Sequence, residues 1–315
     1  MSGIVTLTMN PAIDTYLSGE SLHRSKIRCH VTGCGPGGGG INVARVMCKL
    51  GGDARALVAV GGARGARLLG MLDERGMRHR ETWVEQETRD TFIVFERESK
   101  HRYHIITDGP TLYEAEWRRA LDFVEELVAD GCYLVMSGSL PPGVPDDFYA
   151  RAAALAKARG CRVAVDTSGE PLAAVLREGV WLVKPNRREL VSVAGHELAT
   201  MDDRAQVVER LVQRGAAEVV AATFGPEGSL IATATERWAA DPPPIEPQSE
   251  VGAGDSFLGA LVLALSRDWP LSQGIAFAVA AAGSALSRSG PGLSQREETE
   301  RLFAQINASG GVRPA

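Results

Sequence analysis

A glycine-rich turn near the C-terminal end, Val251-Gly-Ala-Gly-Asp255, carries one acidic residue where a helix is expected to begin. Its two glycines leave the backbone bare, so the amides of Ala253, Gly254 and Asp255 could hold a transferring phosphoryl group. The Asp255 carboxylate could then take a proton from the attacking hydroxyl. The alternative is structural, because an acidic residue in a first helical turn also stabilises the helix dipole. The chemical interpretation makes Gly252, Ala253 and Gly254 an anion hole beside a general base.

A second glycine run, residues 37–40, precedes a stretch that is expected to be helical. From Gly35 it matches G-x-G-x-x-G, the dinucleotide-binding pattern, which would indicate an NAD-dependent oxidoreductase. That interpretation needs an acidic residue at the end of the next strand, where the chain has Gly61-Gly-Ala63 instead. The glycines also let a ligand approach the backbone, and Asn42 in the first turn can hydrogen-bond sugar hydroxyls. A tight turn that only lets helix and strand pack is the structural alternative.

Two further turns follow apolar strands. In Lys184-Pro-Asn186-Arg-Arg-Glu189, Asn and Glu three residues apart form the capping-box pattern that opens a helix. The same two side chains share a helix face and could hold a hydrated Mg²⁺ ion, which takes few protein ligands. The turn at residues 223–228 is rich in small residues and suits a nucleotide that lies against the backbone.

Composition excludes several classes of partner. The 315 residues include 34 Lys and Arg against 39 Asp and Glu, a formal net charge of −5. We therefore expect no nucleic acid and no membrane as partner, since a basic excess supplies the affinity for both. No targeting segment and no apolar run of bilayer length is found. The five cysteines form no C-x-x-C pair and fit neither a disulfide framework nor a thiolate metal site, so we expect a cytoplasmic protein.

The elements that must position these residues follow an α/β pattern. After about residue 112, short apolar runs alternate with amphipathic stretches, which predicts a mostly parallel sheet with helices on both faces. The predicted strands are 4–7, 132–136, 162–165, 181–183 and 219–223, and the predicted helices are 41–50, 114–129, 146–159, 202–214, 254–266 and 271–287.

The first third of the chain predicts a second, smaller sheet. Residues 13–34 look extended, and residues 90–106 alternate like a hairpin around residues 98–100. On one of these strands Lys26, Arg28 and His30 point to the same side and make that face basic. The structural alternative is an edge strand that is guarded by its charges.

Taken together, the motifs resemble those of the ribokinase-like, or PfkB, carbohydrate kinases, from Leu7 to about Leu293. The phrases at residues 8–14, 137–143 and 165–169 look like those of its phosphosugar kinase branch, most of all the minor bacterial 6-phosphofructokinases. The resemblance implies a ribokinase-like α/β fold with a kinase core and an inserted β lid. We expect the core at residues 1–12, 35–86 and 110–308, the lid at 13–34 and 87–109, and a flexible tail at 309–315.

The resemblance implies ATP-dependent phosphorylation of a phosphorylated ketohexose by a homodimer that pairs through the lid, with Mg²⁺ as cofactor. Fructose 6-phosphate is the expected substrate, and fructose 1-phosphate and tagatose 6-phosphate are alternatives. The resemblance makes Asp255 the expected catalytic base, beside Gly254, Ala253 and Gly252. Sugar-binding roles fall on Asp14, Lys26, Gly38, Gly39, Asn42, Ser139 and Arg89, with Arg89 as the phosphate anchor. Nucleotide-binding roles fall on Lys184, Asn186, Thr223, Gly225, Gly228, Ser249, Val251, Ala285 and Arg288, and Asn186 and Glu189 hold Mg²⁺ through water.

The chain departs from the family pattern at two places near the nucleotide. Glu250 stands where a small residue is usual, and Arg288 replaces an amide near adenine. A sugar-phosphate sensor without catalysis is the alternative from another functional class. The joint presence of Asp14, Asn186 and Asp255 disfavours it, because a sensor needs only the sugar-binding residues.

Overall fold

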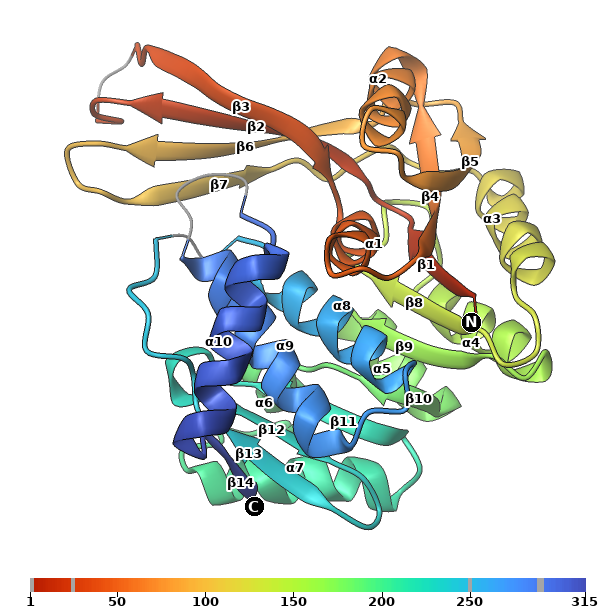
Figure 1. Cartoon of the computed structure of the whole chain (residues 1–315). Helices are drawn as coiled ribbons and strands as arrows, with labels where there is room; N and C mark the ends of the chain where they lie inside the picture. Colours follow the sequence, from red (N-terminus) through yellow and green to blue (C-terminus); the bar gives the residue numbers. More distant parts are fainter. Residues whose placement is uncertain (1–2, 24–25, 249–250, 288–291) are drawn as a thin grey trace.

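The computed structural model describes residues 3–23, 26–248, 251–287 and 292–315. Their strands form a large sheet with helices on both faces and a small sheet that projects to one side (Figure 1). The strands are β1 (Ile4–Thr8), β2 (Ala12–Gly19), β3 (Cys29–Gly37), β4 (Ala54–Gly61), β5 (Arg78–Val84), β6 (Arg89–Glu96), β7 (Arg102–Ile106), β8 (Tyr133–Ser137), β9 (Arg162–Asp166), β10 (Val180–Val183), β11 (Ala217–Thr223), β12 (Ser229–Ala232), β13 (Arg237–Ala240) and β14 (Val312–Pro314).

The helices lie between these strands in the chain and after them. They are α1 (Gly39–Lys49), α2 (Gly62–Asp73), α3 (Glu114–Leu127), α4 (Phe148–Ala158), α5 (Gly169–Glu178), α6 (Arg187–Ala194), α7 (Met201–Gln213), α8 (Ala253–Leu265), α9 (Leu271–Leu286) and α10 (Arg296–Ser309), with a 3-10 turn at Gly225–Glu227. Every predicted strand of the large sheet is present, and so is every predicted helix, with bounds that agree within two residues. Within the described residues, no helix combines the length and the apolar character that crossing a membrane requires.

The large sheet runs in the order β14-β13-β12-β11-β10-β9-β8-β1-β4-β5. Pairing is parallel from β5 to β11 and antiparallel from β11 to β14. All residues of β1 and β8 are buried, as expected of parallel strands covered on both faces. The predicted mostly parallel α/β fold is therefore confirmed.

Alternate strand residues feed two separate core layers. Ile4 of β1 packs with apolar side chains of α1, α8 and α9, whereas Val5 and Leu7 pack with those of α3, α4 and α7. Because the parallel strands all end at the same edge of the sheet, the loops after β1, β8, β9, β10 and β11 meet there. That edge is where the sequence predicts the functional residues.

The C-terminal residues are not a free tail. The sequence predicts a flexible segment at residues 309–315, but Val312–Pro314 forms β14 and pairs antiparallel with β13. The turn at Gly310 and Gly311 after α10 folds the chain back, and the amide of Asp241 donates to the carbonyl of Gly311. The short strand carries no apolar alternation, so its pairing is not visible in the sequence.

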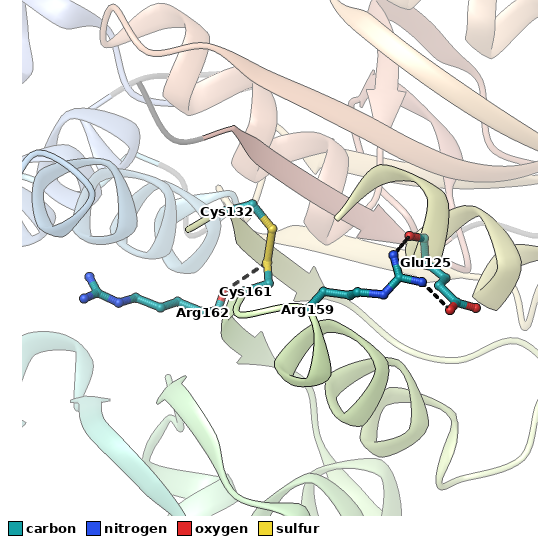
Figure 2. The surroundings of a disulfide bond; sticks show 5 residues. All are labelled: Glu125, Cys132, Arg159, Cys161 and Arg162. Atoms are coloured by element: carbon teal, nitrogen blue, oxygen red, sulfur yellow. Dashed lines mark hydrogen bonds and ion pairs between the residues drawn. A yellow bond between two sulfur atoms is a disulfide. The ribbon is translucent and has the colours of Figure 1, made fainter. Parts of the chain in front are cut away.

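Cys132 and Cys161 form a disulfide (Figure 2), which the sequence analysis did not expect. They directly precede β8 and β9, and the parallel register pairs Tyr133 with Arg162. The register therefore brings the two cysteines side by side, with their Cα atoms 4.7 Å apart. Cysteine spacing along the chain cannot reveal this pairing. Cys29, Cys34 and Cys48 are free thiols.

The small sheet has the order β3-β2-β6-β7 and consists of the two segments predicted as an accessory sheet. β2 pairs antiparallel with β3 and parallel with β6, and β6 and β7 form the predicted hairpin. Its root adjoins the large sheet, because β2 begins at Ala12, shortly after β1 ends at Thr8. This sheet therefore stands over the edge where the loops of the large sheet meet (Figure 1).

Candidate active site

Asp255 and Asn42 meet although they come from distant parts of the chain. Asp255 lies in the first turn of α8, and Asn42 lies in the first turn of α1. The Nδ2 of Asn42 donates to the Oδ2 of Asp255 at 2.9 Å. The two glycine-rich turns that the sequence singled out therefore face each other.

The start of α8 offers backbone amides that have no hydrogen-bond partner among the described residues. Gly252 is the N-cap with φ of 78°, and the first intrahelical bond runs from the amide of Ser256 to the Gly252 carbonyl. The amides of residues 253–255 precede that bond and are available to an anion. A Cβ atom added at Gly254 would lie 3.7 Å from the Nζ of Lys184, so this bare turn opens toward a buried ammonium group.

Lys184 lies among three carboxylates. Its Nζ is 3.1 Å from the Oδ1 of Asp166 at the end of β9. Burial alone would lower the pKa of Lys184, but the charges of Asp166 and Glu189 outweigh it and raise that pKa. Burial and then repulsion by Asp166 raise the pKa of Asp255 to about 6, and the same two causes raise the pKa of Glu189. Three carboxylates, those of Asp166, Glu189 and Asp255, therefore surround one ammonium group, and Lys184 does not neutralise them all.

Asp166 is a site residue that the sequence analysis did not assign. The signal for it is an acidic residue at the carboxyl end of a buried strand, in the segment Val165-Asp-Thr-Ser-Gly169. Its importance follows from strand order, because β9 lies next to β10, after which Lys184 follows. Which strands lie side by side cannot be read from the sequence, so the contact between Asp166 and Lys184 could not be predicted from it.

Asp14 lies on β2 against the first glycine turn. A Cβ atom added at Gly37 would lie 2.2 Å from an oxygen of Asp14, so only glycine leaves room for this carboxylate. A Cβ atom at Gly39 would lie 2.3 Å from the Oγ of Ser137, which seats the start of α1 close to the end of β8. Burial raises the pKa of Asp14 to about 6, although Arg45 and Arg89 act to lower it. Asp14, Gly38 and Gly39 thus share one end of the site.

Arg89, at the start of β6, borders a cavity of about 520 Å³ that Asn10 and Ser139 also line. Its Nη atoms donate to the carbonyls of Thr107, at 2.6 Å, and Asn10, at 3.0 Å, while its Nε is buried without a partner. Burial lowers the pKa of Arg89, and the nearby carboxylates of Asp14 and Asp108 only partly offset this. A cavity beside an incompletely compensated guanidinium suits an anionic group.

Asn186 and Glu189 form a complete capping box. The amide of Glu189 donates to Asn186 Oδ1 at 3.0 Å, and the amide of Asn186 donates to Glu189 Oε2 at 2.8 Å. The structural interpretation of this motif is therefore confirmed, and a role in Mg²⁺ binding stays a prediction. Thr223 joins Asn186 by a parallel bridge, so the turn at Gly225 and Gly228 lies beside the start of α6.

Two other predicted site residues, Lys26 and Ala285, are not brought into this arrangement. Lys26 is exposed in the connection between β2 and β3, at the opposite end of the small sheet from Arg89, which pairs with Ala12. Ala285 is fully buried within α9 and presents no surface to a nucleotide. Val251 is partly buried and directly precedes Gly252, the N-cap of α8. Ser249, Glu250 and Arg288 lie outside the described residues.

Comparison with known proteins adds independent findings. The model of the pfkB family carbohydrate kinases matches residues 5–298. The ATP-dependent 6-phosphofructokinase isozyme 2 of Mycobacterium tuberculosis is 37% identical over 303 residues, which cover 95% of this chain and 88% of that protein. The 1-phosphofructokinase of Escherichia coli is 31% identical over 313 residues, which cover 96% of this chain and 97% of that protein.

Solved structures agree. Phosphofructokinase-2 from Escherichia coli in complex with potassium superposes with a TM-score of 0.94 at 36% identity, covering 98% of this chain and 100% of that chain. The tetrameric inhibited form of the same enzyme gives a TM-score of 0.93 at 35% identity with the same coverage.

Proposed function

The chain belongs to the pfkB family of carbohydrate kinases, and from this premise we propose that it transfers the γ-phosphoryl group of ATP to a phosphorylated ketohexose. The similarity to relatives named 6-phosphofructokinases favours fructose 6-phosphate as the substrate of this chain. The product would then be fructose 1,6-bisphosphate. The similarity to a 1-phosphofructokinase supports fructose 1-phosphate as the alternative.

The contact between Asn42 and Asp255 carries this proposal. Oδ2 of Asp255 accepts from Asn42, and the second carboxylate oxygen, which has no hydrogen-bond partner among the described residues, can accept the proton of a substrate hydroxyl. With a pKa of about 6, Asp255 is mostly ionised at neutral pH yet basic enough to assist the attack. The hydroxyl oxygen then bonds to the γ-phosphorus as the bond to ADP breaks, and the free amides at the start of α8 hold the transferring group.

The charges around Lys184 fit a divalent cation. Repulsion from Asp166 helps to raise the pKa of both Glu189 and Asp255, so added positive charge would relieve it. The described residues contain no group of three or more His, Cys, Asp or Glu side chains placed to bind a metal directly, which suits an ion that keeps its waters. Asn186 and Glu189, with Asp166 nearby, would hold Mg²⁺ through water. When bound, Mg²⁺ neutralises charge on the phosphate groups of ATP.

The sugar phosphate is placed at the root of the small sheet. Asp14 accepts hydrogen bonds from sugar hydroxyls and Asn42 donates to them. The backbone of Gly38 and Gly39 leaves room for the sugar ring. Arg89 supplies charge for the phosphate group from the cavity that Ser139 also lines. Lys26 would add charge only if the connection between β2 and β3 folded toward the site. The small sheet acts as a lid that excludes water and so limits ATP hydrolysis.

The outer face of the small sheet supports a homodimer. Cross-strand pairing puts Val31, Leu17, Val94 and Tyr103 in one row on this face. Val94 is already buried, and the exposed apolar surface comes from Val31, Tyr103 and Ile105. Val31 is 69% exposed and Ile105 51% exposed, an unusual state for apolar side chains of one sheet. A second copy of the chain would bury this face. The formal charge of −5 favours neither nucleic acid nor an anionic membrane in that place.

A coupled ADP-release assay tests the proposed function. The panel contains fructose 6-phosphate, fructose 1-phosphate, tagatose 6-phosphate, fructose and ribose, each with MgATP. Rapid ADP release with one of the phosphorylated sugars is the expected result, and preference for a neutral sugar would overturn the role of Arg89. Saturable binding of a sugar phosphate without ADP release would instead identify a non-catalytic sensor.

A further inference from the structure

Arg45 contacts the amide that holds the proposed base. It lies on α1, three positions after Asn42, and its side chain is largely enclosed. Its Nη1 donates to the carbonyl of Pro36 at 2.8 Å and to the Oδ1 of Asn42 at 3.2 Å. The Nδ2 of the same Asn42 amide donates to Asp255 at 2.9 Å. A continuous path of hydrogen bonds therefore runs from Arg45 to Asp255.

This path determines which way the Asn42 amide faces. A guanidinium group can only donate, so it requires the oxygen end of the amide on its side. The nitrogen end must then face Asp255 and bind one oxygen of its carboxylate. If the amide turned over, its oxygen would face a carboxylate oxygen and its NH₂ group would face a guanidinium, and both contacts would be repulsive.

We propose that Arg45 is a positioning residue, which orients Asn42 so that one oxygen of Asp255 is bound and the other is presented to the substrate hydroxyl. This inference rests on the proposed kinase activity and assigns a function to a side chain outside the sugar and nucleotide sets. The bond to Pro36, at the end of β3, also ties this orientation to the root of the small sheet.

The charge of Arg45 acts on both carboxylates of the site. Burial and then repulsion by Arg75 lower the pKa of Arg45, and Tyr16, Asp14 and Asp255 oppose that effect. A guanidinium keeps its charge in proteins, so Arg45 remains a cation near both carboxylates. The other groups that face Asp255 are Asn42, Lys184, Asp166 and Asp14. Of these, only Asn42 and Lys184 stabilise the ionised base, so loss of the Arg45 contact that orients Asn42 removes one of two supports of this negative charge.

The experiment compares Arg45→Met, Arg45→Lys and Arg67→Met with the wild type, after each variant has been shown to fold by its thermal melt. Arg67 is the matched control, because it contacts the Sγ of Cys34 on β3 and no residue of the site. ADP release is followed against pH with the best sugar phosphate. Arg45→Met is expected to lower kcat by about 100-fold, the cost of a misplaced catalytic group, with little change in the KM for ATP.

The acid limb of the kcat profile distinguishes positioning from a structural role. For Arg45→Met it should move to higher pH, because the Asn42 hydrogen bond that lowers the pKa of Asp255 is no longer held in place. Arg45→Lys should restore the limb and part of kcat, and Arg67→Met should match the wild type.

A folded Arg45→Met protein with wild-type kcat and acid limb would refute the inference while leaving the kinase activity intact. If Arg45→Met does not fold, a lowered kcat in Arg45→Lys at constant KM for ATP supports the inference, and an unchanged kcat refutes it. A wild-type protein without ADP release would instead refute the proposed function itself.

Discussion

The amide of Asn42 donates a 2.9 Å hydrogen bond to the carboxylate of Asp255 across 213 positions of sequence. This contact joins the starts of two helices, each of which follows a glycine-rich turn, at one edge of the large sheet. It brings the start of α1, which would bind the sugar, next to the start of α8, which would bind the transferring phosphoryl group. The relationship gives the following predictions.

Arg89→Ala should weaken binding of the sugar phosphate selectively. The substitution removes charge-assisted hydrogen bonds worth roughly 1.5–3 kcal/mol, so the KM for the sugar phosphate should rise by about 10- to 100-fold. The KM for ATP should change little, because Arg89 lies at the root of the small sheet, beside Asn10. Steady-state kinetics with each substrate varied in turn checks this. Arg119→Ala, a change on the exposed face of α3, is the control, and equal effects of Arg89→Ala on both substrates would contradict the anchor role.

The pH dependence of kcat/KM should show an acid limb with a midpoint of about 6. Burial raises the pKa of Asp255 and of Asp14 to about 6, and both groups act in the ionised form. Protonation below that pH removes the base and weakens the acceptor for sugar hydroxyls, so the limb should be steeper than for one group. Asp14→Asn should leave a limb of single slope. An acid limb below pH 5 would show that neither carboxylate is perturbed as described.

Asp255→Asn should make the protein more stable at neutral pH. The pKa of Asp255 is about 6 in the folded protein against an ordinary 3.8, so the folded state binds this proton more tightly than the unfolded chain does. The contribution of Asp255 to stability therefore falls as pH rises from about 4 to 6 and stays low above that range. Asparagine does not ionise, and we expect a gain of about 1–2 kcal/mol at pH 7 that shrinks toward pH 4.

Urea unfolding at both pH values measures this gain. Asp122→Asn, at an exposed position, should show none. A gain that is equal at pH 4 and pH 7 would mean that the titration of Asp255 is not its cause.

The disulfide between Cys132 and Cys161 should contribute to stability. The bond spans 29 positions, and the loop it closes corresponds to about 3–4 kcal/mol in the chain-entropy account. The pair Cys132→Ala and Cys161→Ala should lower the free energy of unfolding by that order, whereas Cys48→Ala should not. Alkylation of the folded, unreduced protein should label the three free cysteines. Labelling of all five would mean that the thiols are reduced.

The sequence predicts most of the large sheet and singles out Asp255 and Asn42 because both follow local rules. Buried parallel strands appear as short apolar runs, and a glycine-rich turn before a helix start is visible at Gly252 and at Gly38. Asp255 and Asn42 can each be identified from their own turn. Their contact could be proposed only from the resemblance to a kinase family, because nothing local connects residues 213 positions apart.

The residues that the sequence analysis missed depend on strand order. Asp166 ends β9, beside the strand that precedes the predicted residue Lys184, and the disulfide depends on the parallel register of β8 and β9. Arg45 is three positions from Asn42, but its role depends on where Asp255 lies. Ala285 shows the converse error, since a position carried over from a family pattern is fully buried here.

Single-turnover phosphoryl transfer by Asp255→Asn tests the central claim most directly. Enzyme in excess over fructose 6-phosphate is mixed with MgATP, and formation of fructose 1,6-bisphosphate is compared with the wild type and Asp122→Asn. The account predicts a rate lower by about two to four decades, the usual contribution of a positioned base, with ATP binding nearly unchanged. A rate within a few-fold of the wild type would contradict the role of Asp255 as the base.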